Sequence, residues 1–174
     1  MDSEVMRPAI QYVKRNLDGP LIGAEIGVYE GDNAHDILKN IPRVKHLYLV
    51  DPYTGDYWLF KPAYAKTIPP AKQKAYNKIK GYTDKTTWIY ECFEASLIPE
   101  KLDFIYIDAC HHYDCVSHDI REAEKIIKVG SVIGGHDYYP EGVNEHRFGV
   151  GRAVRERYGD SLHHKGTDWW VVIG

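Results

Sequence analysis

The feature that most constrains this fold is a regular alternation of short apolar runs with helix-forming segments. The apolar runs lie at residues 21–27, 46–50, 86–90, 104–107 and 132–133. Helical spacing of apolar side chains is found in the segments between most of them. Strands that alternate with helices form a parallel sheet that is covered by helices on both faces. We therefore predict an α/β fold with a doubly wound, mostly parallel sheet.

The predicted helices and the last two strands complete this fold prediction. We expect helices at residues 5–17, 32–40, 72–80, 116–127 and 152–158. Asp2 or Ser3 is expected to cap the first helix, and Gly130 to end the fourth. Two last strands, at 162–165 and 169–173, are separated by a tight connection and predict an antiparallel edge hairpin. The predicted sheet thus has seven strands.

The length of 174 residues predicts a single domain that spans 1–174. One segment, at about 52–70, breaks the rhythm with five prolines and glycines mixed with aromatic residues. A long loop that is rich in aromatic side chains is more typical of a functional lid than of a disordered linker. The alternative is a packed surface loop, or one buried in a dimer contact.

Charge and cysteine content limit the class of protein. The net charge is −3 and the pI is about 6.3, so we expect no nucleic-acid and no membrane partner. The three cysteines are odd in number and lack CxxC spacing, which favours a reduced, cytoplasmic protein. No signal peptide is recognisable, and no apolar run approaches the roughly 20 residues that span a bilayer. A homo-oligomer remains open.

Acidic residues follow the apolar runs. They are Glu25, Asp51, Glu91, Asp108 and the pair His136–Asp137. If the strands are parallel, these side chains share one edge of the sheet, where like charges repel. A ligand with hydroxyl groups, a cation or a metal ion would relieve that repulsion. Each acid taken alone could equally be a helix cap or a solvated loop residue.

The glycines of the first strand and turn indicate what the ligand is. Gly23, Gly27 and Gly31 are spaced four apart, which differs from the GxGxxG pattern that binds a pyrophosphate. Asp51 lies 20 residues beyond Gly31, where a carboxylate can accept both hydroxyls of a ribose. This half of the sheet therefore predicts an adenosine site without a diphosphate.

The motifs together resemble those of a known family. Residues 25–31 resemble the glycine-rich first motif of class I S-adenosylmethionine-dependent methyltransferases, which have a Rossmann-like fold. Residues 107–113, Asp119 and residues 129–138 are similar to the second half of one subgroup of it. That subgroup contains small O-methyltransferases that often need a divalent metal and act on sugars and natural products. The resemblance covers residues 20–155.

The resemblance implies a role for each matched residue in binding S-adenosylmethionine. Gly27 and Gly31 would let the backbone approach the cofactor, and Glu25 would hold its amino group. Asp51 would bind the ribose hydroxyls. Phe93, with Cys92 as the competing candidate, would pack on the adenine, and Asp108 would also face the cofactor.

Metal binding is implied by the same resemblance. Asp108 and Asp137 match metal-binding carboxylates of the metal-dependent members, and His136 stands where those members usually have another acid. The set Asp108, His136 and Asp137 could hold Mg²⁺ or Mn²⁺, and an imidazole suits transition metals. Alternatively, His136 contacts cofactor or substrate and no metal is bound.

His111 matches a general base in some relatives. Methyl transfer to a hydroxyl requires removal of its proton, for which a histidine is suited. A metal at Asp108 would also acidify the hydroxyl. His112 is the local competitor, and the structural alternative for both is capping and packing at the start of the following helix.

We therefore predict an S-adenosylmethionine-dependent methyltransferase that acts on a hydroxyl of a small-molecule acceptor, such as a sugar or natural product. Loops 52–70 and 138–150 would recognise that acceptor. Two alternatives remain. One is a metal-dependent hydrolase that uses Asp108, His111, His136 and Asp137. The other is a non-catalytic cofactor-binding protein.

Overall fold

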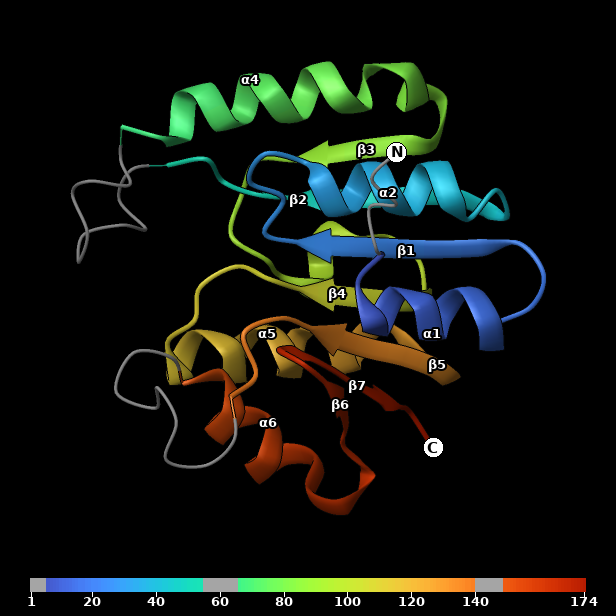
Figure 1. Ribbon diagram of the computed structural model, residues 1–174, viewed down its shortest axis with the longest axis vertical. Helices are drawn as coiled ribbons and strands as arrows, with labels where there is room; N and C mark the ends of the chain where they lie inside the picture. Colours follow the sequence, from blue (N-terminus) through green and yellow to red (C-terminus); the bar gives the residue numbers. More distant parts are fainter. Residues whose placement is uncertain (1–5, 55–65, 140–148) are drawn as a thin grey trace.

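A computed structural model describes residues 6–54, 66–139 and 149–174 of the chain (Figure 1). Its centre is a seven-stranded sheet with the order β3-β2-β1-β4-β5-β7-β6. The strands are β1 (Leu21–Ile26), β2 (Val44–Val50), β3 (Thr86–Ile89), β4 (Leu102–Ile107), β5 (Ile127–Gly135), β6 (His163–Lys165) and β7 (Asp168–Val172). The helices are α1 (Pro8–Asn16), α2 (Asp32–Asn40), α4 (Ile68–Ile79), α5 (Tyr113–Ile126) and α6 (Val150–Tyr158). Short 3-10 turns lie at Lys80–Lys85, Ala95–Leu97 and Gly159–Ser161.

The strand pairing confirms the predicted fold class. β1 to β5 pair in parallel, whereas β7 runs antiparallel to both β5 and β6. The strand order reverses between β1 and β4, which is the point where ligands bind in open α/β sheets. Ile26 is in register with both Val50 and Ile107, so the carboxyl ends of these strands are level.

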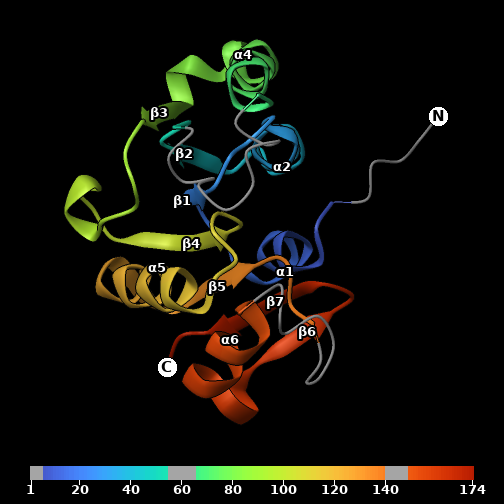
Figure 2. The same ribbon diagram turned by 90° about the vertical axis from the view of Figure 1, so that its left-hand side faces the viewer.

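The sheet is buried on both faces. Alternate residues of β4 point to opposite sides: Phe104 and Tyr106 pack with residues of α1, α2 and α4, whereas Ile105 and Ile107 pack with α5 and α6. Figure 2, which looks onto the carboxyl ends, shows α1 and α2 on one side of the sheet and α5 on the other. Among the described residues, no helix has the length and apolar character needed to cross a membrane.

Several predicted boundaries were wrong. The first helix begins at Pro8 with Arg7 as its N-cap residue, because a proline fits the first helical position. Asp2 and Ser3, the predicted caps, lie outside the described residues. Helix α5 ends at Ile126 rather than at Gly130, because the extended, buried Ile127 already starts β5.

The predicted lid falls largely outside the described residues. Residues 55–65 of the 52–70 segment are not described, nor are residues 140–148 of the second predicted loop. Helix α4 begins at Ile68, earlier than predicted, because two prolines are tolerated in the first turn of a helix.

Candidate active site

The predicted strand ends meet at one edge of the sheet. The backbone N–H of Gly27 donates to the carbonyl of Val50 at 2.8 Å, and that of Asp108 donates to Ile26 at 2.7 Å. The backbone N–H of His136 donates to Ile107 at 3.1 Å. Each chain segment thus keeps one more hydrogen bond beyond its strand before it turns away. The side chains that follow β1, β4 and β5 therefore lie beside one another.

Gly27 is required by the packing of two of these turns. Its φ angle is +87°, a conformation that L-residues rarely adopt. A Cβ atom at this position would lie 2.2 Å from the carbonyl oxygen of Asp108. The glycine therefore lets the loop after β1 contact the loop after β4, a contact that the sequence analysis did not predict.

A cavity of about 320 Å³ opens along this edge. Among the residues that line it are Glu25, Gly27, Asp51, Phe93, Asp108 and His111. The structure thus brings together five of the six residues predicted to bind the cofactor. The sixth, Gly31, does not line the cavity; it has a φ of +77° and is the N-cap residue of α2.

Glu25, the penultimate residue of β1, is buried, with an exposed fraction of 2%. Its Oε1 accepts a hydrogen bond from Asn33 Nδ2 at 2.9 Å, and its Oε2 has no hydrogen-bond partner in the described part of the chain. Burial raises the pKa of Glu25 to about 8, and the nearby carboxylates Asp108 and Asp51 act in the same direction. A cationic group of a ligand would satisfy this carboxyl.

Asp51 has a structural task that the sequence did not reveal. Its Oδ2 accepts hydrogen bonds from the backbone N–H groups of Val28 at 3.0 Å and Tyr29 at 2.9 Å, and Oδ1 accepts one from Tyr53 at 2.9 Å. A carboxylate offers about four acceptor positions. Three are therefore used to shape the loop after β1, and roughly one is left for a ribose hydroxyl.

His111 lies between two carboxylates. Its Nε2 is 3.0 Å from Asp137 Oδ2 and 3.5 Å from Asp108 Oδ1. His112, by contrast, is exposed and is the N-cap residue of α5. The structure thus separates the two histidines that the sequence could not distinguish, and only His111 lines the cavity.

His136 faces the same carboxylates from the end of β5. Its Nδ1 is 3.3 Å from Asp137 Oδ1 and 3.9 Å from Asp108 Oδ1, and its Nε2 shares a 2.8 Å hydrogen bond with Thr167 Oγ1. Burial alone would lower the pKa of His136, but Asp137 and Asp108 raise it above its usual value.

Asp137 has an unusual backbone and a perturbed carboxyl group. Its φ is +57°, which is strained for a residue that carries a side chain. Burial would raise its pKa, but the hydrogen bond with His136 and the charge of His111 hold the pKa below its usual value. Asp137 is therefore an anion that is oriented between two imidazoles.

The residues at this point fit a divalent metal ion. Asp108, His111 and Asp137 each offer one ligand atom, and these atoms all lie within 4.8 Å of one another. Two carboxylates and an imidazole suit Mn²⁺ or another transition metal better than Mg²⁺, which prefers oxygen ligands. His136 was predicted as the imidazole of this set; its Nε2 shares a hydrogen bond with Thr167, while its Nδ1 lies on the side of the two carboxylates, 3.9 Å from Asp108 Oδ1.

Arg7 is a site residue that sequence reasoning missed. It lines the cavity, and its guanidinium lies 3.8 Å from Asp108 Oδ2 and 3.9 Å from Asp168 Oδ1. Asp168 is 2% exposed and accepts hydrogen bonds from the backbone N–H of Ala9 at 3.1 Å and from Tyr106 Oη at 3.0 Å. No local pattern could link residues that are about 160 positions apart.

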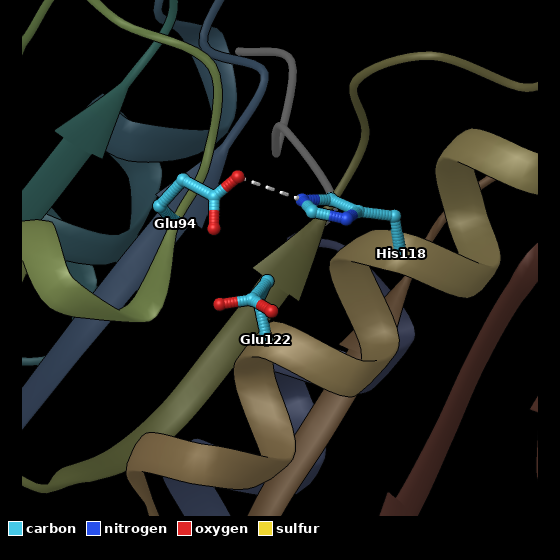
Figure 3. A group of neighbouring side chains, drawn as sticks. All are labelled: Glu94, His118 and Glu122. Carbon is cyan, nitrogen blue, oxygen red and sulfur yellow. Dashed lines mark ion pairs between the residues drawn. The ribbon is translucent and has the colours of Figure 1, made fainter.

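A second group of polar residues braces the loop after β3 (Figure 3). His118 Nε2 lies 3.1 Å from the carbonyl oxygen of Phe93 and 3.5 Å from Glu94 Oε1. Glu122 Oε2 accepts a hydrogen bond from the backbone N–H of Ala95 at 3.0 Å. His118 and Glu122, one turn apart on α5, therefore fix the loop that carries Phe93 into the cavity.

The strand order, the glycine turn after β1 and a cavity at the reversal point define the class of protein: the architecture is that of the class I S-adenosylmethionine-dependent methyltransferases. A family model described as a methyltransferase domain matches residues 24–138, so the chain belongs to that family. A search of curated protein sequences gave no match.

Solved structures share this fold. One is an rRNA methylase from Streptococcus thermophilus, 13% identical, with a TM-score of 0.65 and coverage of 97% of this chain and 96% of that one. Another is a protein of Streptococcus mutans described as a methyltransferase, in complex with SAH, at 12% identity, a TM-score of 0.65 and coverage of 96% and 98%. A TDP-rhamnose 3'-O-methyltransferase of calicheamicin biosynthesis has 13% identity, a TM-score of 0.62 and coverage of 95% and 78%.

Proposed function

We propose that this methyltransferase transfers the methyl group of S-adenosylmethionine to a hydroxyl of a small polar acceptor, such as a sugar or natural product. One observation carries the proposal: His111 lines the cavity, and its Nε2 lies 3.0 Å from Asp137 Oδ2. The hydroxyl oxygen forms a bond to the methyl carbon as the carbon–sulfur bond breaks. The sulfonium becomes a neutral thioether, and His111 accepts the hydroxyl proton.

The donor would lie across the edge of the sheet. Glu25 would pair with its ammonium group, and the remaining acceptor position of Asp51 would bind the ribose. Phe93 would form an apolar wall for the adenine. Gly27 would let the backbone of the loop after β1 lie close to the donor.

A divalent ion is a second element of the proposal. Asp108, His111 and Asp137 would hold it, with His136 orienting Asp137. When bound, the ion would acidify the acceptor hydroxyl. In that case His111 is a ligand instead of the base, so activity that survives thorough chelation would favour His111 as the base.

The kind of acceptor is also part of the proposal. A fold neighbour acts on TDP-rhamnose and supports a hydroxyl acceptor, whereas another neighbour is an rRNA methylase. The net charge of −3 disfavours a nucleic-acid substrate, because RNA binding needs a basic surface. We propose a cytoplasmic enzyme without nucleic-acid or membrane partners, and its assembly as a homo-oligomer is open to direct measurement.

Calorimetry and a turnover assay test this function. We expect S-adenosylhomocysteine to bind the wild-type protein, and no binding up to millimolar concentration would refute the donor site. A panel of sugars would first identify an acceptor from its methylated hydroxyl product. With that acceptor, His111→Ala should still bind S-adenosylhomocysteine but lose turnover by about 10²–10⁴-fold. His112→Ala, the exposed neighbour, is the matched control and should keep turnover. Full turnover by His111→Ala would refute the role of His111.

A further inference from the structure

The polar group drawn in Figure 3 also has the composition of a metal site. Glu94, His118 and Glu122 each offer one ligand atom, and these three atoms all lie within 4.8 Å of one another. Glu94 comes from the loop after β3, whereas His118 and Glu122 are four residues apart and share one face of α5. Within the described ranges, none of the three lines the donor cavity. This cluster is therefore separate from the one that follows β4 and β5.

The distances around the His118 imidazole are those of ligands that share one ion. Its Nε2 lies 3.1 Å from the carbonyl oxygen of Phe93 and 3.5 Å from Glu94 Oε1. Two ligands that each lie about 2.1 Å from a zinc ion are separated by roughly 3.0–3.4 Å when the angle between them is square or tetrahedral. An ion would therefore fit among these atoms after small side-chain movements. The carbonyl oxygen of Phe93 is a fourth candidate ligand.

The carboxylates of the cluster have the capacity to bind a cation. Glu122 accepts a hydrogen bond from the backbone N–H of Ala95 through Oε2 and pairs with Lys125 through Oε1. A carboxylate offers about four acceptor positions, so each oxygen keeps roughly one position for a metal ion. Lys125 is exposed and can turn to solvent. With a neutral imidazole, the carboxylates of Glu94 and Glu122 balance the charge of a divalent ion.

A buried oxygen beside the cluster lacks a hydrogen-bond donor. Asp119 follows His118 on α5, is 4% exposed, and has no hydrogen-bond partner for its Oδ2 within the described part of the chain. Burial raises the pKa of Asp119, and the charges of all three cluster residues act on it as well, so its carboxyl group lies close to them. Because an unpaired buried oxygen is costly, it indicates a donor that the protein alone does not supply. A water molecule bound to the ion would be such a donor.

We propose that Glu94, His118 and Glu122 form a site for Zn²⁺ that ties the loop after β3 to α5. An imidazole suits a transition metal, and zinc also accepts carboxylate oxygens. Mg²⁺ prefers oxygen ligands and is expected to bind this site poorly. The inference goes beyond methyl transfer, because the ion would have a structural role and would bind in the absence of donor and acceptor.

Calorimetric titration of the metal-free protein with Zn²⁺ tests this site. Asp108→Asn and Asp137→Asn together form the background, because they remove two ligands of the cluster at the strand ends. In this background one Zn²⁺ per chain should bind. Adding His118→Ala should weaken that binding by more than about 100-fold, since even the outer-shell partners of a metal contribute 10- to 100-fold. Adding His112→Ala, an exposed histidine beside the start of the same helix, is the matched control and should leave the affinity unchanged.

Two further measurements make the outcome decisive. Glu94→Gln changes an exposed side chain without altering its size, so it replaces His118→Ala if that protein fails to fold, and it should also weaken Zn²⁺ binding. Zn²⁺ should raise the urea midpoint of the background and leave that of the His118→Ala protein unchanged. Absence of Zn²⁺ binding in the background, or equal affinity in all variants, would overturn the site. Binding of S-adenosylhomocysteine to the same proteins tests the donor site separately, so the two proposals can fail independently.

Discussion

Replacing Glu25 by glutamine should make the ligand-free protein more stable at alkaline pH. The pKa of Glu25 is raised from its usual value of 4.5 to about 8, mainly by burial. The folded state therefore binds a proton more tightly than the unfolded state does. The stability contributed by this group is fully present below pH 4.5 and is lost as the pH rises through 8. A pKa difference of this size corresponds to an upper limit of roughly 5 kcal/mol.

The glutamine variant removes that dependence because its amide has no charge at any of these pH values. Its oxygen can still accept the hydrogen bond from Asn33 that Glu25 accepts at 2.9 Å. We expect the two proteins to have similar unfolding free energies at pH 5. At pH 9 we expect the variant to be more stable by up to several kcal/mol.

Urea denaturation of both proteins at each pH unit from 5 to 9 measures this difference. The difference between the two curves isolates Glu25, since every other titrating group is shared. Glu91→Gln changes an exposed acid that lines the same cavity and is the matched control; it should not reproduce the stabilisation expected for Glu25→Gln at pH 9. Parallel curves for wild type and Glu25→Gln, or a variant that is less stable at pH 9, would refute the reasoning.

Three further outcomes follow from the same structure. Donor binding at pH 7 should release most of a proton from Glu25, measured by calorimetry in buffers of different ionisation enthalpy. Equal heats in all buffers would contradict this. The Cβ atom of Gly27→Ala would lie 2.2 Å from the carbonyl oxygen of Asp108. This variant should lower the free energy of unfolding by about 2–4 kcal/mol and abolish donor binding. An unchanged unfolding free energy together with unchanged donor binding would show that the two loops are not in contact. Asp168→Ala leaves the hydroxyl of Tyr106 unpaired and should cost about 3 kcal/mol in urea denaturation, whereas a cost under 1 kcal/mol would argue against the buried contact.

Much of the donor half could be predicted from sequence because its residues follow directly after strands. A parallel sheet brings the carboxyl ends of its strands to one edge, so Glu25, Asp51 and Asp108 had to lie near one another once the alternation was recognised. Gly27 could also be predicted, because a tight turn with a positive φ favours a glycine and that glycine is visible in the local sequence. These are features in which chain order determines position.

The contacts that could not be predicted depend on packing between distant elements. Arg7 reaches Asp108 and Asp168 only because α1 lies beside β4 and β7. The spacing of residues along the chain does not predict this packing. The assignment of His111 rather than His112 depends on where α5 begins, since His112 is the exposed N-cap residue of that helix and only His111 lines the cavity. The three backbone N–H groups that bind Asp51 come from turns with positive φ at Tyr29 and Tyr53, two residues that usually avoid it.

The carboxyl groups of the cavity differ in how many hydrogen bonds the protein donates to their oxygens, and that difference indicates their roles. Asp51 is satisfied by three backbone N–H groups, so it organises the loop before any ligand arrives. Glu25 and Asp119 each keep a buried oxygen without a partner, at opposite ends of the cavity. Both have pKa values raised mainly by burial, and the raised pKa of Glu25 means that the ligand-free protein holds a proton where the ammonium group of the donor would lie. Burying a carboxyl oxygen without a partner costs stability in the ligand-free protein, as expected when binding residues are selected for the complex rather than for the empty fold.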